Sequence, residues 1–385
     1  MEFLNNYFKL KERESSVKIE IIAGVTTFLS MAYIIFVNPD ILSATGMPKD
    51  ALIIATCLAS AFACLLVGFV AKVPIAMAPG MGLNAFFAFT LVQAGTVSWQ
   101  TGLGIVFISG LVFFILSVTR VRERIVKAIP APIIDATSVG IGIFIAFIGL
   151  KNLGIVVNDD TNLVTLGQFS TPVLIGIAGL LLIIILELFK VKGSILISIV
   201  ATTVVGILLG KVSMPEKMVN LNFNYSRILL QLDIIGALKW GFLGSIFTLM
   251  FVDMFDSVGT LVACLKEAKL VKEDGTLKEL GTLLTLDAVA TMVGALLGTS
   301  TTTAYVESAT GIEEGGRTGI TAIVTGLLFL LAIVLLPIIS IVPGFATAPA
   351  LIVVGLFMMK GVRNVDFKDL EIAFPAFMTI MLMPL

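Results

Sequence analysis

Long apolar segments separated by short polar ones make up most of this chain. Runs close to the length that crosses a hydrocarbon core of about 30 Å as a helix lie at 20–37, 51–71, 101–119, 132–150, 171–189, 193–210, 240–262, 280–298, 318–340 and 347–359. Two further segments, 74–95 and 299–315, have spanning length but contain Pro and Gly in the first and a Thr-rich run in the second. We expect both to be interrupted helices.

The composition agrees with a polytopic membrane protein. Of the 385 residues, 58% are hydrophobic and 13% are charged, whereas a soluble protein carries about 25% charged residues. The net charge of -1 offers no basic surface for a nucleic acid. The three cysteines lie in apolar sequence without a CxxC spacing, and the chain has no histidine, so we expect neither a metal site nor a cofactor.

The distribution of basic residues predicts the orientation. If the N-terminus is cytoplasmic and each segment crosses once, 19 of the 25 Lys and Arg residues lie on the cytoplasmic side. This asymmetry follows the positive-inside rule only when 74–95 and 299–315 both count as crossings. We therefore expect a multi-pass protein of the cell membrane with a cytoplasmic N-terminus.

Weak internal repeats indicate two halves. The TG pair at 101–102 recurs at 318–319, and Ala131-Pro132 recurs at the same spacing as Ala348-Pro349. The interrupted third span of each half crosses in opposite directions, so the repeats are inverted, as in transporters that bind substrate between paired broken helices. Seven spans per half predict fourteen, of which this sequence covers about twelve and a half. We expect the remainder to lie beyond it.

Ionisable residues within apolar segments are the first candidates for function, because they are costly at membrane depth. Asp253, Asp256 and Thr260 share one helical face in FVDMFDSVGT. A polar packing seam is the alternative to a functional role for this face. Asp287 could bind substrate directly, or it could cap free amides of the neighbouring broken helix.

The two interrupted segments hold the remaining candidates. Glu307 lies in the middle of the second one, after Thr residues whose β-branching favours a short strand. The first one, VPIAMAPGMGLNAFFAF, offers close backbone approach at its glycines and a donor and acceptor at Asn84. Phe86 and Phe87 could stack on a planar ligand.

Three motifs resemble one transporter family: MAPGMGLNAFFAF at 77–89, FVDMFDSVGTL at 251–261 and LDAVATMVGALLGTSTTTAYVESATGIEEGGRTG at 286–319. They are similar to the nucleobase-cation symporters of the xanthine/uracil permease superfamily, in the AzgA-like branch of hypoxanthine, adenine and guanine permeases. The resemblance implies an all-α, 7+7 inverted-repeat fold with short β-strands in spans three and ten. It also implies a core domain of 1–120 and 237–340, and a gate domain of 121–236 and 341–385.

The resemblance further implies a transporter that imports purine nucleobases, and not an enzyme. The substrate-binding residues carried over are Glu307, Asp256, Asn84, Ala85, Phe86, Tyr305 and Thr303, and those for coupling or support are Asp287, Asp253 and Thr260. Uracil-type relatives commonly have a histidine at the position of Thr260, which favours the purine branch. Proton symport with Asp256 as the carrier is the expected coupling, and sodium is the alternative. A homodimer through the gate domains is also expected.

Other functions fit the residues less well. A carrier of uracil, xanthine or an inorganic anion could share this fold, but an anion site should offer positive helix ends and basic groups instead of three acids. An intramembrane aspartyl protease needs two aspartates as an acid–base pair. Such enzymes share a GxGD motif, and neither Asp253, Asp256 nor Asp287 is part of such a motif.

Overall fold

The computed structural model describes residues 2–95, 97–119, 131–159, 161–214, 225–271, 277 and 279–383. These residues form two compact units, one from 1–122 with 217–340 and one from 123–216 with 341–385. In the described part of the chain, eight helices are long and apolar enough to span a membrane, and four shorter apolar helices accompany them. The assignment of core and gate roles to the chain stays a prediction.

The first unit contains the first four predicted spans. Its elements from this part of the chain are α1 (Glu2–Phe8), α2 (Val17–Met31), α3 (Ile34–Ser43), α4 (Lys49–Leu66), the π-helical turn η1 (Val67–Ala71), β1 (Met77–Pro79), α5 (Met81–Ala85), the π-helical segment η2 (Phe86–Ala94) and α6 (Trp99–Val118). The predicted interruption of 74–95 is confirmed, because this segment is a strand followed by a helix.

The same unit contains the corresponding spans of the second half. They are α11 (Ile234–Ala237), the turn η3 (Trp240–Phe242), α12 (Leu243–Glu267), α13 (Leu280–Leu297), β4 (Thr302–Ala304), α14 (Ser308–Glu313), α15 (Gly319–Val334) and α16 (Leu336–Ser340). Segment 299–315 is again a strand followed by a helix, as predicted.

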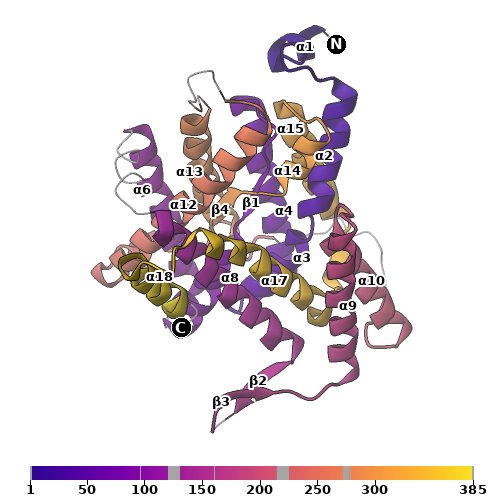
Figure 1. The fold of residues 1–385 in the computed structure, drawn as a ribbon, viewed down its shortest axis with the longest axis vertical. Helices are drawn as coiled ribbons and strands as arrows, with labels where there is room; N and C mark the ends of the chain where they lie inside the picture. The colour runs from indigo at the N-terminus through magenta and orange to yellow at the C-terminus, as the bar shows by residue number, and fades with distance from the viewer. Residues whose placement is uncertain are drawn as a thin grey trace. The chain divides into compact units, whose positions relative to one another are not determined.

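The two short strands pair with each other. β1 and β4 run antiparallel, with Met77 opposite Ala304 and Pro79 opposite Thr302 (Figure 1). Gly80 donates its N–H to the Thr301 carbonyl at 2.9 Å, and Tyr305 donates to the Ala76 carbonyl at 3.0 Å. Backbone groups that helix breaking frees in the membrane interior are thus satisfied between the two repeats. Pro79 lacks an N–H but faces Thr302 at a position of the ladder that needs none.

The first span is not the single helix that the run at 20–37 predicts. It ends as α2 at Met31 and resumes as α3 at Ile34. Neither Gly nor Pro lies at this break, so the local sequence does not predict it. Tyr33 lies at this break, and its hydroxyl donates a hydrogen bond to Glu307.

Close helix packing holds the first unit together. α15 packs against α2 and α4, and α13 packs against α6. At Gly24 of α2 an added Cβ would lie 2.7 Å from the Thr321 carbonyl oxygen, and at Gly68 it would lie 2.7 Å from that of Gly319. Glycine at these positions lets the backbones approach closely, as is common between membrane helices.

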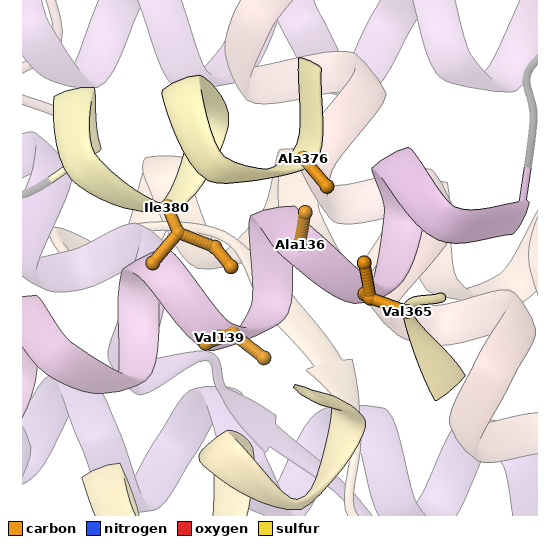
Figure 2. Packing of buried hydrophobic residues seen from close by; sticks show 5 residues of the cluster. All are labelled: Ala136, Val139, Val365, Ala376 and Ile380. Carbon is orange, nitrogen blue, oxygen red and sulfur yellow. The ribbon is translucent and has the colours of Figure 1, made fainter. Parts of the chain in front are cut away.

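The second unit contains α8 (Ala131–Leu153), the hairpin β2 (Val156–Asp159) and β3 (Leu163–Leu166), α9 (Thr171–Leu188), α10 (Ser194–Leu208), α17 (Gly344–Met358), the turn η4 (Met359–Asn364) and α18 (Leu370–Leu382). α17 packs along α8, α9 and α10. Figure 2 shows a buried cluster in which Ala136 and Val139 of α8 meet Val365 and, from α18, Ala376 and Ile380. This apolar cluster packs α18 against α8.

Candidate functional site

The structure brings the predicted acids together in the first unit. Asp253 and Asp256 lie on α12, Asp287 lies on α13, and Glu307 is the N-cap of α14, directly after β4. Asp256 interacts electrostatically with Glu307 and with Asp287, and Asp253 interacts with Asp287. Acids far apart in sequence therefore form one group, carried by α12, α13 and the residue directly after β4; Figure 1 labels these elements.

The four acids differ in accessibility. The side chain of Asp256 is exposed and Glu307 is half-buried, whereas Asp253 and Asp287 are 1% and 0% exposed. Burying a charge without a partner is expensive. Asp256 and Glu307 are thus the members that a ligand can reach, and Asp253 and Asp287 lie behind them.

A tyrosine that the sequence did not indicate holds Glu307. The Tyr33 hydroxyl, at the break between α2 and α3, donates a 2.5 Å hydrogen bond to Glu307 Oε1. Tyr33 is fully buried. One turn further on, the Thr310 hydroxyl donates to the Glu307 carbonyl at 2.8 Å and lies 3.0 Å from the Ser30 hydroxyl. The first span therefore positions the broken second-half span.

Asn84 belongs to a buried amide network. Its Nδ2 donates to Asn38 Oδ1 on α3, and Asn38 Nδ2 donates to the Thr56 and Thr299 hydroxyls at 2.8 and 3.1 Å. Asn38 and Asn84 are both 0% exposed. The network connects spans one, two and three to the residue that precedes the second broken span. The position of Asn38 directly after the apolar run 20–37 was the only local signal for it.

The remaining predicted contact residues surround the strands. Tyr305 donates its hydroxyl to the Pro79 carbonyl at 2.6 Å, and an added Cβ at Gly80 would lie 2.9 Å from Thr303 Cγ2. Ala85, Thr303 and Tyr305 are buried, and Phe86 is half-buried. Thr260 is half-buried on α12, one turn beyond Asp256.

The stacking role expected for Phe87 is wrong. Its ring is fully buried, and an added Cβ at Gly102 of α6 would lie 2.8 Å from its Cε2 atom. Phe87 therefore packs against α6 and presents no free face. Phe86, the other aromatic residue of this pair, keeps an accessible surface.

A threonine, and not Asp287, satisfies the backbone of the second broken span. The Thr291 hydroxyl on α13 accepts the N–H of Thr302 at 3.1 Å and lies 3.1 Å from the Thr302 carbonyl. It also lies 3.1 Å from Asp253 Oδ2. Asp287 faces the Ser257 hydroxyl, but within the described residues neither of its oxygens reaches a donor with ordinary hydrogen-bond geometry.

Another buried acid, Glu20, escaped the sequence analysis because it begins the first apolar run. Its carboxylate accepts the backbone N–H groups of Arg317 and Thr318 at 2.9 and 3.1 Å. It also accepts the hydroxyls of Ser15 at 2.7 Å and Thr321 at 2.6 Å. Glu20 thus satisfies free amides at the N-terminus of α15, where a negative charge is favourable.

Arg13 binds the same end of the first unit. Its guanidinium donates to the Lys72 carbonyl at 2.6 Å and to the Arg317 carbonyl at 2.9 Å. Burial lowers the pKa of this guanidinium, while Glu279, Glu20 and Glu12 raise it. An arginine stays charged at neutral pH even when its pKa is lowered. The N-terminal segment is thereby tied to the chain just before β1 and just after α14.

Within the part of the chain that the structure describes, no group of three or more His, Cys, Asp or Glu side chains is arranged to hold a metal ion. Two of the four acids instead accept hydrogen bonds from hydroxyl groups: Glu307 from Tyr33 and Asp253 from Thr291. Such an arrangement can accept N–H bonds from a ligand and can hold a proton.

Sequence comparison places this arrangement among known transporters. The sequence model of the Permease family (xanthine/uracil permeases) matches residues 18–385. The chain is 42% identical to the adenine permease AdeP of Escherichia coli, over 99% of this chain and 86% of that protein. It is 43% identical to the guanine/hypoxanthine permease PbuG of Bacillus subtilis, over 99% of this chain and 89% of that protein.

A solved structure shares the architecture. The transmembrane domain of the cyanobacterial bicarbonate transporter BicA superimposes with a TM-score of 0.73 at 16% identity, covering 95% of each chain. At this identity the likeness shows the fold alone. It confirms the 7+7 inverted-repeat transporter fold that the sequence predicts, with short strands in the two interrupted spans.

Proposed function

This chain belongs to the Permease family of multi-pass membrane transporters, and on that premise we propose that it imports purine nucleobases. Relatives that match nearly its whole length include an adenine permease and a guanine/hypoxanthine permease. The family consists of permeases and not of enzymes. The likeness to a bicarbonate transporter extends to the fold and carries no argument about the substrate.

One observation carries the proposal: two accessible acids, Glu307 and Asp256, interact across the point where the two repeats break their helices. Hypoxanthine and guanine present ring N–H donors beside a carbonyl acceptor. A carboxylate accepts such N–H groups in charge-assisted hydrogen bonds, which are about twice as strong as neutral ones. An acidic site suits these N–H edges and repels an anion.

We assign Glu307 to the six-membered ring edge of the base. The Tyr33 hydroxyl donates to Oε1, which fixes the orientation of this carboxylate. Asp256 meets the imidazole side of the base, directly or through a water molecule, and Phe86 supplies an apolar face. Ala85, Thr303 and Tyr305 shape the strands around the base, and Asn84 orders the first broken span through Asn38.

Coupling is proposed to be proton symport. Asp256 is the most exposed acid of the group, which makes it the carrier through which a proton enters. Asp253, Asp287 and Thr260 lie along the same helices and support it. Sodium is the alternative coupling ion, and the experiment below includes it.

The remaining expectations complete the proposal. Segments 1–120 and 237–340 act as the substrate-carrying core, and 121–236 with 341–385 act as the gate. The N-terminus lies in the cytoplasm, and two copies associate through their gate segments. Labelling of a cysteine introduced near the N-terminus, from either side of the membrane, would test the orientation. Cross-linking between copies would test the association.

The decisive test is uptake of labelled hypoxanthine, guanine, adenine, xanthine and uracil by cells that lack their own nucleobase permeases. Uptake is measured with and without a pH gradient, and with and without sodium. We expect saturable purine uptake that a proton gradient drives and that sodium does not. Absence of uptake of every base by protein that reaches the membrane would refute the proposed function.

A further inference from the structure

The inverted repeats hold their two strands with equivalent side chains. On α4, in span two, the Cys64 thiol donates to the Met77 carbonyl at 3.2 Å and accepts the Met77 N–H at 3.4 Å. On α13, in span nine, the Thr291 hydroxyl lies 3.1 Å from both the N–H nitrogen and the carbonyl oxygen of Thr302. Each side chain therefore clamps the outer edge of the strand in its own repeat.

The clamped backbone groups are those that the β1–β4 ladder leaves free. In an antiparallel pair, hydrogen-bonded positions alternate with positions whose N–H and C=O point away from the partner strand. Gly80 with Thr301 and Tyr305 with Ala76 are bonded positions, so Met77 and Thr302 fall between them. Thr302 is 0% exposed, and its carbonyl is costly to leave without a donor.

Within the described part of the chain, only the second clamp is bonded to an acid. Thr291 lies 3.1 Å from Asp253 Oδ2 as well as from the Thr302 carbonyl. Among the residues that the structure describes, Cys64 forms hydrogen bonds to Met77 alone. A threonine hydroxyl has one proton to donate, so Thr291 can serve either the acid or the strand, and never both.

We propose that Thr291 transmits the charge state of Asp253 to β4 and thereby couples proton binding to substrate binding. When Asp253 is ionised, the Thr291 proton goes to Oδ2, because bonds to a charged acceptor are about twice as strong as those to a neutral one. The Thr302 carbonyl then loses its donor. This inference rests on the proposed function.

Protonation reverses the bond. A proton on Oδ2 makes Asp253 a neutral O–H donor to Thr291 Oγ1, and the Thr291 proton turns to the Thr302 carbonyl. Thr302 N–H remains bonded to the same hydroxyl throughout. Both outward backbone groups of Thr302 are then held, and Glu307, the residue at the start of the helix after β4, is fixed for the base. Substrate affinity is therefore highest when the proton is bound.

The surroundings of Asp253 suit such a switch. Asp287 and Asp256 are its electrostatic partners, and Asp256 in turn faces Glu307. α5, α6 and β4, which pack against α12, carry no charged residue. The charged residues of α4 and α14, Lys49, Asp50 and Glu313, lie at their helix ends. A proton that enters at exposed Asp256 is shared within this group of acids, and Thr291 senses its arrival at Asp253.

The test uses Thr291→Val, which removes the hydroxyl at nearly constant volume, and Thr291→Ser, which retains it. In the wild type the KM for the transported purine rises with external pH, by up to about tenfold per pH unit, the limit for one linked proton. We expect Thr291→Val to transport with a KM that changes less than about twofold per pH unit, and Thr291→Ser to restore the wild-type slope. Cys64→Ala is the matched control, which should raise KM equally at every pH.

Two results overturn the inference while leaving the proposed function intact. One is a wild-type pH slope in Thr291→Val, and the other is an equal loss of slope in Cys64→Ala. If Thr291→Val does not reach the membrane, Asp253→Asn replaces it, because the amide stays neutral and should give a low KM that is independent of pH. A retained slope in Asp253→Asn overturns the inference as well. Lack of purine uptake by the wild type refutes the proposed function instead.

Discussion

Replacing Glu307 with glutamine tests the proposed substrate ligand with little change in shape. Glutamine can keep the bond from Tyr33, because its carbonyl oxygen accepts the same hydroxyl that now lies 2.5 Å from Oε1. The amide nitrogen then stands where the second carboxylate oxygen was. It presents N–H groups to a base that offers N–H groups itself.

The expected loss follows from this geometry. A hydrogen bond to a charged group is worth about 1.5–3 kcal/mol, and an unpaired buried donor costs about 1–3 kcal/mol. Because Tyr33 fixes which end faces the base, both effects apply. A total of about 3 kcal/mol or more corresponds to an increase in KM of roughly 100-fold or more.

The assay is purine uptake at several concentrations, with the amount of protein in the membrane measured alongside. Glu313→Gln is the matched control, because Glu313 ends the same helix and is exposed. We expect the control to transport as the wild type does. A KM for Glu307→Gln within about threefold of the wild type, less than 1 kcal/mol, would remove Glu307 from the site.

Three further changes test the elements that position the site. Tyr33→Phe should raise KM by about tenfold, since it removes one bond to a charged group, and double substitution with Glu307→Gln should add little; additive effects in uptake kinetics would contradict the pairing. Glu20→Gln should lower the free energy of unfolding by about 2 kcal/mol, because an amide meets four donors; an unchanged melting temperature in detergent would argue against this role. Gly311→Ala should destabilise the protein by about 1–3 kcal/mol, because its Cβ would lie 2.5 Å from the Ala23 carbonyl oxygen, and normal expression and transport would refute the close approach.

The helices could be predicted from the sequence because spanning depends on local hydropathy. Except for 20–37 and 318–340, each of which forms two helices, the predicted runs coincide with helices to within a few residues. Both predicted interruptions lie where Pro79, Gly80 and the Thr-rich run indicated them. Asp253, Asp256, Asp287 and Glu307 also stood out locally, since each is a charge inside an apolar segment. These features need no knowledge of what the helices contact.

The partners of these residues could not be predicted in the same way. Tyr33 and Glu307 are 274 positions apart, and Glu20 and Arg317 are 297 apart. The first span breaks at Tyr33 although neither Gly nor Pro lies there. The sequence also does not distinguish Phe87, which is buried, from its neighbour Phe86, which is half-buried. These contacts and the burial of these side chains depend on which helices pack together, and hydropathy does not predict helix packing.

The sequence by itself determined that this chain spans the membrane repeatedly, breaks two helices and carries acids near those breaks, because burying charge or leaving backbone groups unpaired in lipid is costly. The tertiary structure decided which acids are accessible and which hydroxyls hold them. Antiparallel pairing of β1 with β4 left Met77 and Thr302 to be clamped from outside, and the packing of α12 beside α13 placed Asp253 on one clamp only. That asymmetry arises from contacts within the second repeat, where the single hydroxyl proton of Thr291 can be donated to only one of two acceptors, Asp253 or the Thr302 carbonyl.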